Sequence, residues 1–328
     1  MSEDQNVKRV LDQAIVKQLC ESHAGKRLDV VLVELFPEYS RSRLKLWIKQ
    51  EQVLLNGETA KPKTRVAGDE ELQLSVQTIE SEERCVAENI PLNIVHQDAS
   101  IIVINKPAGL VVHQAAGHYS GTLQNALLYF DESLEAIPRA GIVHRLDKDT
   151  TGLMVVARTL SAHKYLVDQI QKHDVLRQYQ AVVYGVMTGG GKVDQPIGRH
   201  PRDRIKMAVR ENGRQAVTHY RLLQRFREHC HIKLQLETGR THQIRVHMSH
   251  LRHPIVGDAV YSGRHRNPAG AEAELVEYLQ CFKRQALHAW KLSFIHPESD
   301  EQVTYEAPLP DDMQQLITLL QADLQANG

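Results

Sequence analysis

The segment that covers residues 140–158, AGIVHRLDKDTTGLMVVAR, constrains the fold of this chain more than any other segment. A short apolar pair leads into a polar run at residues 144–151, and Gly152 then introduces an apolar run at residues 153–157. The polar run contains an imidazole, a guanidinium, an ammonium group, two carboxylates and two hydroxyls, which is more polar chemistry than a surface turn requires. The fold must therefore hold this polar run between apolar segments.

These residues alone leave two interpretations of the polar run open. In the first, Asp149 and Gly152 belong to an ordinary turn and Lys148 is solvated. In the second, Asp147 is a reactive carboxylate, and neighbouring cations favour its ionised form at neutral pH.

Length and composition favour a cytosolic protein of two domains. The chain has 328 residues, 42% of them hydrophobic, which is more than one modest core usually organises. Its first residues are polar and no apolar run is long enough to span a bilayer, so we expect no secretory signal and no membrane contact. The four cysteines form no C-x-x-C pair and the histidines form no H-E-x-x-H pattern, so we expect free thiols and no metal site.

Charge is distributed unevenly along the chain, although the formal net charge is zero. Basic residues far outnumber acidic ones between residues 199 and 252, whereas residues 80–98 and the segment after Pro297 are acidic. Such a basic region is either a solvated face or the cationic surface that a polyphosphate backbone requires.

The N-terminal part predicts a lead-in at residues 1–22, a small domain at residues 23–77 and an acidic linker at residues 78–91. Within the small domain, spacing and turn signals predict a helix at residues 28–35, a second helix after a cap at Ser40, and strands at residues 53–55 and 71–76. One helix carries an apolar face with Leu44, Trp47 and Ile48 and is otherwise basic.

Residues 92–328 predict a second, larger domain. Strands are expected at residues 94–95, 101–104, 176–184, 205–209, 216–226, 231–237, 286–295 and 303–305, and helices at residues 161–173, at residues 241–251 and from residue 311. Because strands outnumber helices and short turns join many of them, we expect an α+β fold with a mixed, mostly antiparallel sheet.

Four motifs resemble those of the RNA pseudouridine synthases that modify ribosomal RNA. They are KPAG at residues 106–109, HRLDKDTTG at residues 144–152, ETGRTHQIRVH at residues 237–247 and RQALHA at residues 284–289. They occur in the family's order, and the resemblance spans nearly all of residues 25–310. The small N-terminal domain resembles the S4 RNA-binding domain of a small-subunit ribosomal protein. The resemblance implies the pseudouridine synthase fold behind an S4-like domain.

The resemblance also implies a reaction that needs no cofactor, in which the N-glycosidic bond of a uridine is cut, the uracil is rotated in place and the base is rejoined through carbon five. Asp147 matches the family's essential aspartate, which could act as a nucleophile at the sugar or as a base toward the ribose. Arg245 matches the arginine that pairs with this aspartate, where a bidentate guanidinium serves better than lysine. Tyr179 matches the tyrosine that lies against the target base.

The implied substrate is 23S ribosomal RNA, within the large subunit or its assembly intermediate, and the implied enzyme acts as a monomer. Arg145 would either fill the gap left by a flipped uridine or contact a phosphate. Candidates for contacts to the RNA backbone are Arg41, Arg43, Lys45, Arg199, Arg202, Arg204, Lys206, Arg210, Arg214 and Arg240. Leu287 and His288 are expected to be structural. The sequence QAAG at residues 114–117 departs from the family, where a proline followed by a glycine is usual.

Two rival functions use the same residues. Residues 147–151 fit D-x-D-x-T, the signature of magnesium-dependent haloacid-dehalogenase-type phosphatases, which should follow a buried parallel strand. Alternatively, the chain is a ribosome assembly factor that binds RNA without modifying it. Transfer RNA stays open as a further substrate.

Overall fold

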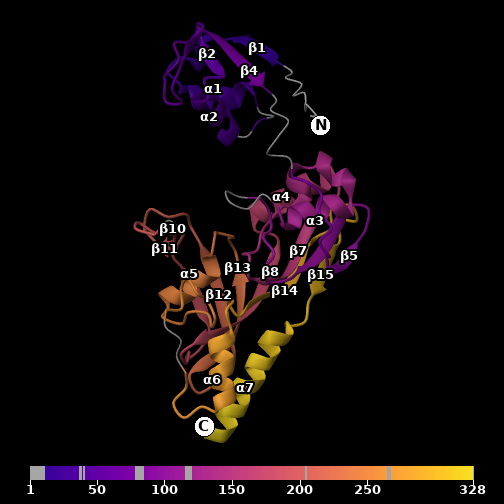
Figure 1. Ribbon diagram of the computed structural model, residues 1–328, viewed down its shortest axis with the longest axis vertical. Helices are drawn as coiled ribbons and strands as arrows, with labels where there is room; N and C mark the ends of the chain where they lie inside the picture. Colours follow the sequence, from indigo (N-terminus) through magenta and orange to yellow (C-terminus); the bar gives the residue numbers. More distant parts are fainter. Residues whose placement is uncertain are drawn as a thin grey trace, which may run out of the picture. The chain divides into compact units, whose positions relative to one another are not determined.

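The computed structural model describes residues 12–36, 39, 41–77, 85–114, 120–203, 205–263 and 267–327. The chain divides into two compact units, Met1–Arg84 and Cys85–Gly328. Each unit has its own apolar core. Figure 1 shows the helices and strands of both units.

The N-terminal unit packs two helices against a four-stranded antiparallel sheet with the strand order β1-β4-β2-β3. Its elements are β1 (Asp12–Gln18), the 3-10 helix η1 (Glu21–His23), α1 (Leu28–Leu35), α2 (Arg41–Lys49), β2 (Val53–Leu55), β3 (Glu58–Thr59) and β4 (Glu71–Gln77). The apolar faces of both helices are buried, among them Leu28, Leu32, Leu44 and Ile48. The predicted helices and hairpin are therefore confirmed.

Within the predicted lead-in, residues 12–18 form β1, which pairs with β4 along its whole length. Polar side chains on much of this strand explain why its sequence gives no clear strand pattern. The predicted cap at Ser40 and residues 78–84 of the predicted linker lie outside the described residues. Residues 85–91 contain no helix or strand.

A large mixed sheet with the strand order β5-β6-β7-β14-β8-β13-β12-β9 organises the second unit, with β15 also paired to β14. The strands are β5 (Ile94–Gln97), β6 (Ile101–Lys106), β7 (Thr151–Ala157), β8 (Leu176–Tyr184), β9 (Gly191–Asp194), β12 (Val217–Arg225), β13 (His229–Leu236), β14 (Leu287–Ile295) and β15 (Gln302–Glu306). β7 and β14 are parallel, and the other pairs are antiparallel. The expected fold class is confirmed.

Helices and a small hairpin complete the second unit. They are α3 (Leu123–Phe130), the 3-10 helices η2 (Glu132–Ala136) and η3 (Pro138–Gly141), α4 (Leu160–Lys172), the hairpin strands β10 (Ile197–Arg199) and β11 (Met207–Val209), α5 (Gln243–His250), α6 (Ala273–Cys281) and α7 (Asp311–Asn327). α3 and α4 lie near one end of the sheet, and α6 and α7 lie near the other (Figure 1). The predicted elements do not include α3, α6, β7, β9 and β10. β9 and β10 have four and three residues, which are too few to show a period.

The apolar run at residues 153–157 forms most of β7, whose seven residues are all buried. Met154 and Val156 belong to the apolar cluster that includes α3, whereas Leu153 and Val155 belong to the cluster that includes α4. Both faces of β7 are thus covered, which explains an apolar run without alternation. Within the described residues, no helix is long and apolar enough to cross a membrane.

Candidate active site

The polar run leads directly into the first residue of β7. Its backbone turns at Asp147, whose carbonyl accepts a hydrogen bond from the Thr150 amide at 3.1 Å. Two hydrogen bonds tie the end of the run to the segment around β14: Gln285 Nε2 donates to Thr150 Oγ1 at 2.9 Å, and Thr151 Oγ1 lies 2.8 Å from His288 Nδ1. These two hydrogen bonds fix the end of the polar run against the sheet.

Lys106 anchors the same loop from beneath. Its buried ammonium group donates hydrogen bonds to the carbonyl oxygens of Pro107, Leu110 and Lys148. Burial lowers the pKa of Lys106 to about 8, against the opposing effect of the carboxylates of Asp149 and Asp147. Lys106, the first residue of the KPAG motif, thus holds the loop by a hydrogen bond to the loop's backbone at Lys148.

Asp147 pairs with Arg245 of α5, as expected from the resemblance. Arg245 Nη1 lies 3.0 Å from Asp147 Oδ2, although 98 residues separate the two. The side chain of Asp147 is 18% exposed and that of Arg245 is 7% exposed, so the carboxylate faces open space while the guanidinium is enclosed.

A second carboxylate fixes the guanidinium. Arg245 Nε and Nη2 donate to Asp258 Oδ2 and Oδ1 at 2.7 Å and 2.9 Å, and Asp258 is fully buried. Asp258 also accepts the backbone amides of Val260 and Tyr261, and the Tyr261 ring lies 5.0 Å from the centre of the guanidinium. Burial alone would lower the pKa of Arg245, but hydrogen bonding and charge from Asp258, aided by Asp147, raise it above its ordinary value.

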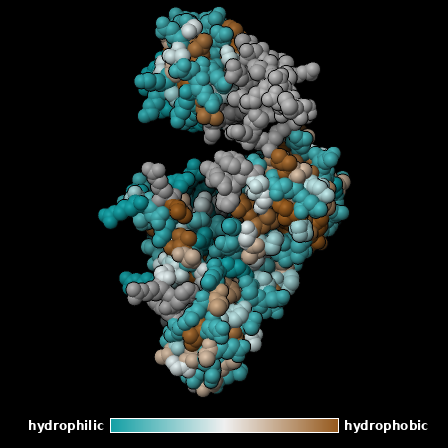
Figure 2. Space-filling view, in the orientation of Figure 1, coloured by the Kyte–Doolittle hydropathy of each residue, from teal (hydrophilic) through white to brown (hydrophobic). Residues whose placement is uncertain are grey.

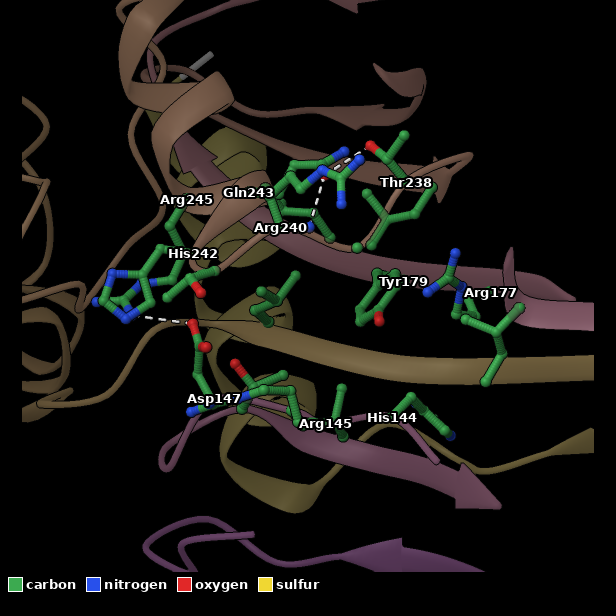
Figure 3. A pocket seen from close by; sticks show the side chains of 18 of the residues that line it. His144, Arg145, Asp147, Arg177, Tyr179, Thr238, Arg240, His242, Gln243 and Arg245 are labelled. Atoms are coloured by element: carbon green, nitrogen blue, oxygen red, sulfur yellow. Dashed lines mark hydrogen bonds and ion pairs between the residues drawn. The ribbon is translucent and has the colours of Figure 1, made fainter. Parts of the chain in front are cut away.

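Tyr179 lies on β8, which places its ring in the same cavity as Asp147 (Figure 3). The cavity has a volume of about 430 Å³ and is bounded by the polar run, the end of α4, β8 and the segment that leads into α5. Figure 2 shows hydrophilic residues around a hollow between the β10–β11 hairpin and α4. Burial raises the pKa of Tyr179, so its hydroxyl is protonated at neutral pH.

The loop between β13 and α5 is shaped by Gln243. Its side-chain oxygen accepts from Thr238 Oγ1 at 2.8 Å and from the Arg240 amide at 2.9 Å, and its nitrogen donates to the Val217 carbonyl at 2.9 Å. These bonds bring the loop to the edge of the cavity and begin the helix that carries Arg245.

The candidate RNA-binding residues of the second unit lie in two places, at the cavity and at the β10–β11 hairpin. Arg145 is exposed and lines the cavity, and Arg240 lines it too, with Nε donating to the Gln215 carbonyl at 3.0 Å. Arg199 ends β10 and Lys206 precedes β11, so both belong to the hairpin beyond the cavity wall. Arg202, Arg210 and Arg214 lie in the same hairpin region, and Arg204 lies outside the described residues.

In the N-terminal unit, Arg41 and Lys45 surround the buried Asp29. Their nitrogens lie 3.5 Å and 3.2 Å from Asp29 Oδ2, and Arg27 Nε lies 2.9 Å from Asp29 Oδ1. Three cations thus share one carboxylate, which leaves surplus positive charge at this surface. The side chain of Arg43 lies outside the described residues.

Sequence reasoning missed Asp258 and assigned no role to Lys106 or Arg177. Asp258 follows a short apolar segment, and nothing in the local sequence indicates its pairing with Arg245. Leu287 lines the cavity, and His288 lies in the interior, where it contacts Thr151.

The rival phosphatase signature lacks its structural context. Residues 142–146 form no strand apart from a single bridge at Ile142, and Asp147 lies before β7 rather than after a parallel strand. Among the residues that the structure describes, no three histidine, cysteine or acidic side chains converge as metal ligands would.

The site consists of a carboxylate oriented by an enclosed guanidinium, in a cavity with a tyrosine ring on its wall. A sequence profile described as RNA pseudouridylate synthase matches residues 100–250, and one described as S4 domain matches residues 26–72. A protein of Xanthomonas campestris pv. campestris named ribosomal large subunit pseudouridine synthase D is 56% identical over 313 residues, which cover 95% of this chain and 93% of that protein.

A protein of the same name from Escherichia coli (strain K12) is 52% identical over 306 residues, which cover 93% of this chain and 94% of that protein. The solved structure of human RNA pseudouridylate synthase domain containing 4 is 28% identical, with a TM-score of 0.55 over 70% of this chain and 93% of that chain. The chain therefore belongs to the RNA pseudouridylate synthase family.

Proposed function

We propose that this protein converts specific uridines of large-subunit ribosomal RNA to pseudouridine, with Asp147 as the essential residue. The observation that carries the proposal is the contact of Asp147 with Arg245 in a cavity of about 430 Å³, within a chain that aligns over 95% of its length with a large-subunit pseudouridine synthase. The proposed RNA is 23S ribosomal RNA within the large subunit or its assembly intermediate, and the proposed enzyme acts as a cytoplasmic monomer.

The reaction breaks the bond from ribose C1′ to uracil N1 and forms a bond from C1′ to C5. C5 loses a proton and N1 gains one, so the net change is an isomerisation. Asp147 faces the cavity while Arg245 holds one of its oxygens, so the other oxygen can reach the ribose. There it acts as nucleophile at C1′ or as base toward the ribose. Both roles use the carboxylate that Arg245 Nη1 contacts at 3.0 Å.

Tyr179 supplies a flat apolar surface for the uracil. Because burial keeps its hydroxyl protonated, the hydroxyl can donate a hydrogen bond to the base while the uracil rotates. The same hydroxyl is our candidate relay for the C5 proton: it accepts this proton as it gives its own to water, and N1 takes up a proton in exchange.

A uridine inside a stacked helix cannot reach this cavity, so it must be extruded. Arg145 is exposed on the cavity wall, where its planar side chain could occupy the space that the uridine leaves. The hairpin of β10 and β11, Arg240 and the cations around Asp29 are proposed to contact RNA phosphates.

The direct test incubates the purified protein with large-subunit ribosomal RNA in the presence of a chelator and maps pseudouridines by base-specific chemical labelling. We expect formation by the natural protein and a decrease of more than about 1,000-fold in Asp147→Asn and Asp147→Ala. Asp168→Asn changes an exposed carboxylate on α4 outside the cavity and is the matched control, with full activity expected.

A cellular comparison separates the enzyme from an RNA-binding assembly factor. Pseudouridines are mapped across total RNA, transfer RNA included, in cells with the gene, without it, and with the Asp147→Asn variant. Full modification with the variant would exclude Asp147 as the essential residue. Modification confined to transfer RNA would overturn the proposed substrate.

A further inference from the structure

Arg177 is a buried cation with no carboxylate partner among the residues that the structure describes. It lies on β8, two residues before Tyr179, is 7% exposed and lines the cavity. Within the described part of the chain, its guanidinium makes one hydrogen bond, a long one of 3.3 Å from Nη2 to the Glu237 carbonyl, and its buried Nε makes none. Burial lowers the pKa of Arg177, which reflects the cost of enclosing this charge.

Three other buried or partly buried cations of this unit have carboxylate or carbonyl partners that compensate their charge. Arg245 is shared by Asp147 and Asp258, Arg227 pairs with Asp323 at 2.9 Å, and Lys106 is surrounded by three carbonyl oxygens. A buried guanidinium without such partners destabilises a fold, so its presence calls for an anion that arrives from outside.

The surroundings of Arg177 are built to receive an acceptor. A β-carbon on Gly239 would lie 2.9 Å from Arg177 Nη1, so the glycine leaves room for the guanidinium at the loop. His144 accepts the Val155 amide through Nε2 at 3.1 Å, and burial with the nearby Arg177 charge lowers the pKa of His144 to about 3. The neutral ring therefore carries its proton on Nδ1, which makes it a second donor in the cavity wall.

The charges that line the cavity show which anion fits. Its arginines are Arg145, Arg177, Arg240 and Arg245, whereas Asp147 is the one acidic residue among the lining side chains that the structure describes. Arg245 is already matched by two carboxylates. Uracil and ribose are neutral, so the phosphodiester groups are the anions that an RNA substrate brings.

We propose that Arg177 binds a backbone phosphate of the substrate RNA, beyond Tyr179 from the side of Asp147 (Figure 3). This inference rests on the proposed function. A phosphate held there fixes the strand next to the extruded nucleotide, so Arg177 acts as a positioning residue while Asp147 acts on the ribose. A planar guanidinium can hold two phosphate oxygens at once, which a lysine cannot.

The test uses a ribosomal RNA fragment that contains a uridine mapped in the cellular comparison. Uncharged methylphosphonate linkages replace the phosphates near this uridine one at a time, and kcat/KM is measured with the natural protein, Arg177→Gln and Arg177→Lys. We expect one linkage whose neutralisation lowers kcat/KM of the natural protein about tenfold and leaves Arg177→Gln unaffected. Arg177→Lys should retain part of the sensitivity at the same linkage.

Two further measurements distinguish this role from others. Arg177→Gln should unfold at the same temperature as the natural protein or higher, because it removes an uncompensated buried charge; a lower temperature would mark Arg177 as structural and overturn the proposal. Unchanged linkage sensitivity together with a shifted pH profile of kcat would also overturn it, since Arg177 would then act on the ionisation of Tyr179.

The controls separate the two proposals. Lys164→Gln removes an exposed charge on α4 outside the cavity wall and should respond to every linkage as the natural protein does.

If the natural protein forms no pseudouridine in the fragment, the proposed function fails. If it is active and no linkage depends on Arg177, the proposed function stands and the phosphate site fails. Failure of Arg177→Gln to fold would likewise mark Arg177 as structural and overturn the site. Equal sensitivity of Arg177→Lys and the natural protein at every linkage would overturn it independently.

Discussion

At the scale of single residues, Arg245 determines how Asp147 is presented. Its Nε and Nη2 are committed to the buried Asp258, so the guanidinium plane cannot turn, and Nη1 is left at 3.0 Å from Asp147. A lysine could not contact both carboxylates in this fixed geometry. Asp258 therefore fixes the guanidinium that contacts Asp147, although Asp258 does not line the cavity.

Asp258→Asn should impair both stability and catalysis. The substitution leaves Arg245 with one carboxylate and a mismatched amide, so we expect unfolding free energy to fall by about 3 kcal/mol and kcat/KM to fall roughly tenfold to a hundredfold. Denaturant unfolding and pseudouridine formation measure the two effects. Asp312→Asn, which removes the carboxylate of the more exposed pair with Arg284, should cost less than about 1 kcal/mol. Normal kcat/KM in Asp258→Asn would contradict the positioning role.

Buried histidines predict how stability depends on pH. Burial lowers the pKa of His229, His231 and His288 from 6.5 to about 4 in each case. Between pH 6.5 and 4 the unfolded chain binds protons that the folded chain does not, so stability is full above pH 6.5 and decreases below it. Each histidine contributes about 1.4 kcal/mol per pH unit in this window. Denaturant unfolding at pH 8, 6 and 5 measures the slope, which His231→Gln should reduce; a constant stability would refute the prediction.

At the scale of elements, the parallel pairing of β7 with β14 sets the position of the loop at residues 144–150. Thr151 pairs with His288 and Gly152 with Ala289, at the point where the polar run enters the sheet. Gly152 has φ +120°, and a β-carbon there would lie 2.3 Å from the Ala289 carbonyl oxygen. The glycine of the motif is thus required for strand contact, while its neighbours supply the chemistry.

Gly152→Ala should destabilise the second unit by at least about 2 kcal/mol, because strain and a backbone clash coincide. It should also lower kcat, since β7 must shift and carry the loop with it. Gly121→Ala is the matched control: its φ is +67° but nothing lies within 4 Å of the added carbon, so about 1 kcal/mol of strain is expected. Equal unfolding free energies for the two variants would show that the clash is relieved without cost.

At the scale of the whole molecule, the two units have separate cores and carry different features. The second unit contains the whole cavity, and the first carries three cations around Asp29. Chemistry and part of the RNA affinity are therefore expected to be separable.

Removal of residues 1–84 should weaken RNA binding and retain chemistry at saturating RNA. We expect a higher KM, an unchanged kcat, and a shallower dependence of affinity on salt, because phosphate contacts are lost. Binding titrations from 50 to 200 mM salt measure the slope. Charge reversal by Lys164→Glu in the full chain controls for a general electrostatic effect. An unchanged affinity would rule out a binding role for this unit.

The amino-acid sequence by itself determined the family and the local elements. The resemblance of the HRLD and TGRTHQIRVH motifs predicted that Asp147 pairs with Arg245, and regular apolar spacing predicted α1, α4 and β8. These signals are local, because side chains that face one core recur at the period of a helix or strand. Where an element is very short, as in β9, or half-polar, as in β1, the same signal is too weak to detect.

The tertiary structure decided the pairings that the resemblance did not imply. It supplied Asp258 as the second partner of Arg245, and left Arg177 enclosed without a carboxylate among the described residues. Pairing and burial depend on strand order and loop closure, which bring together residues that are distant in the chain. The sequence gives the charge of each side chain, whereas the partner that neutralises this charge comes into contact with it only when the chain folds.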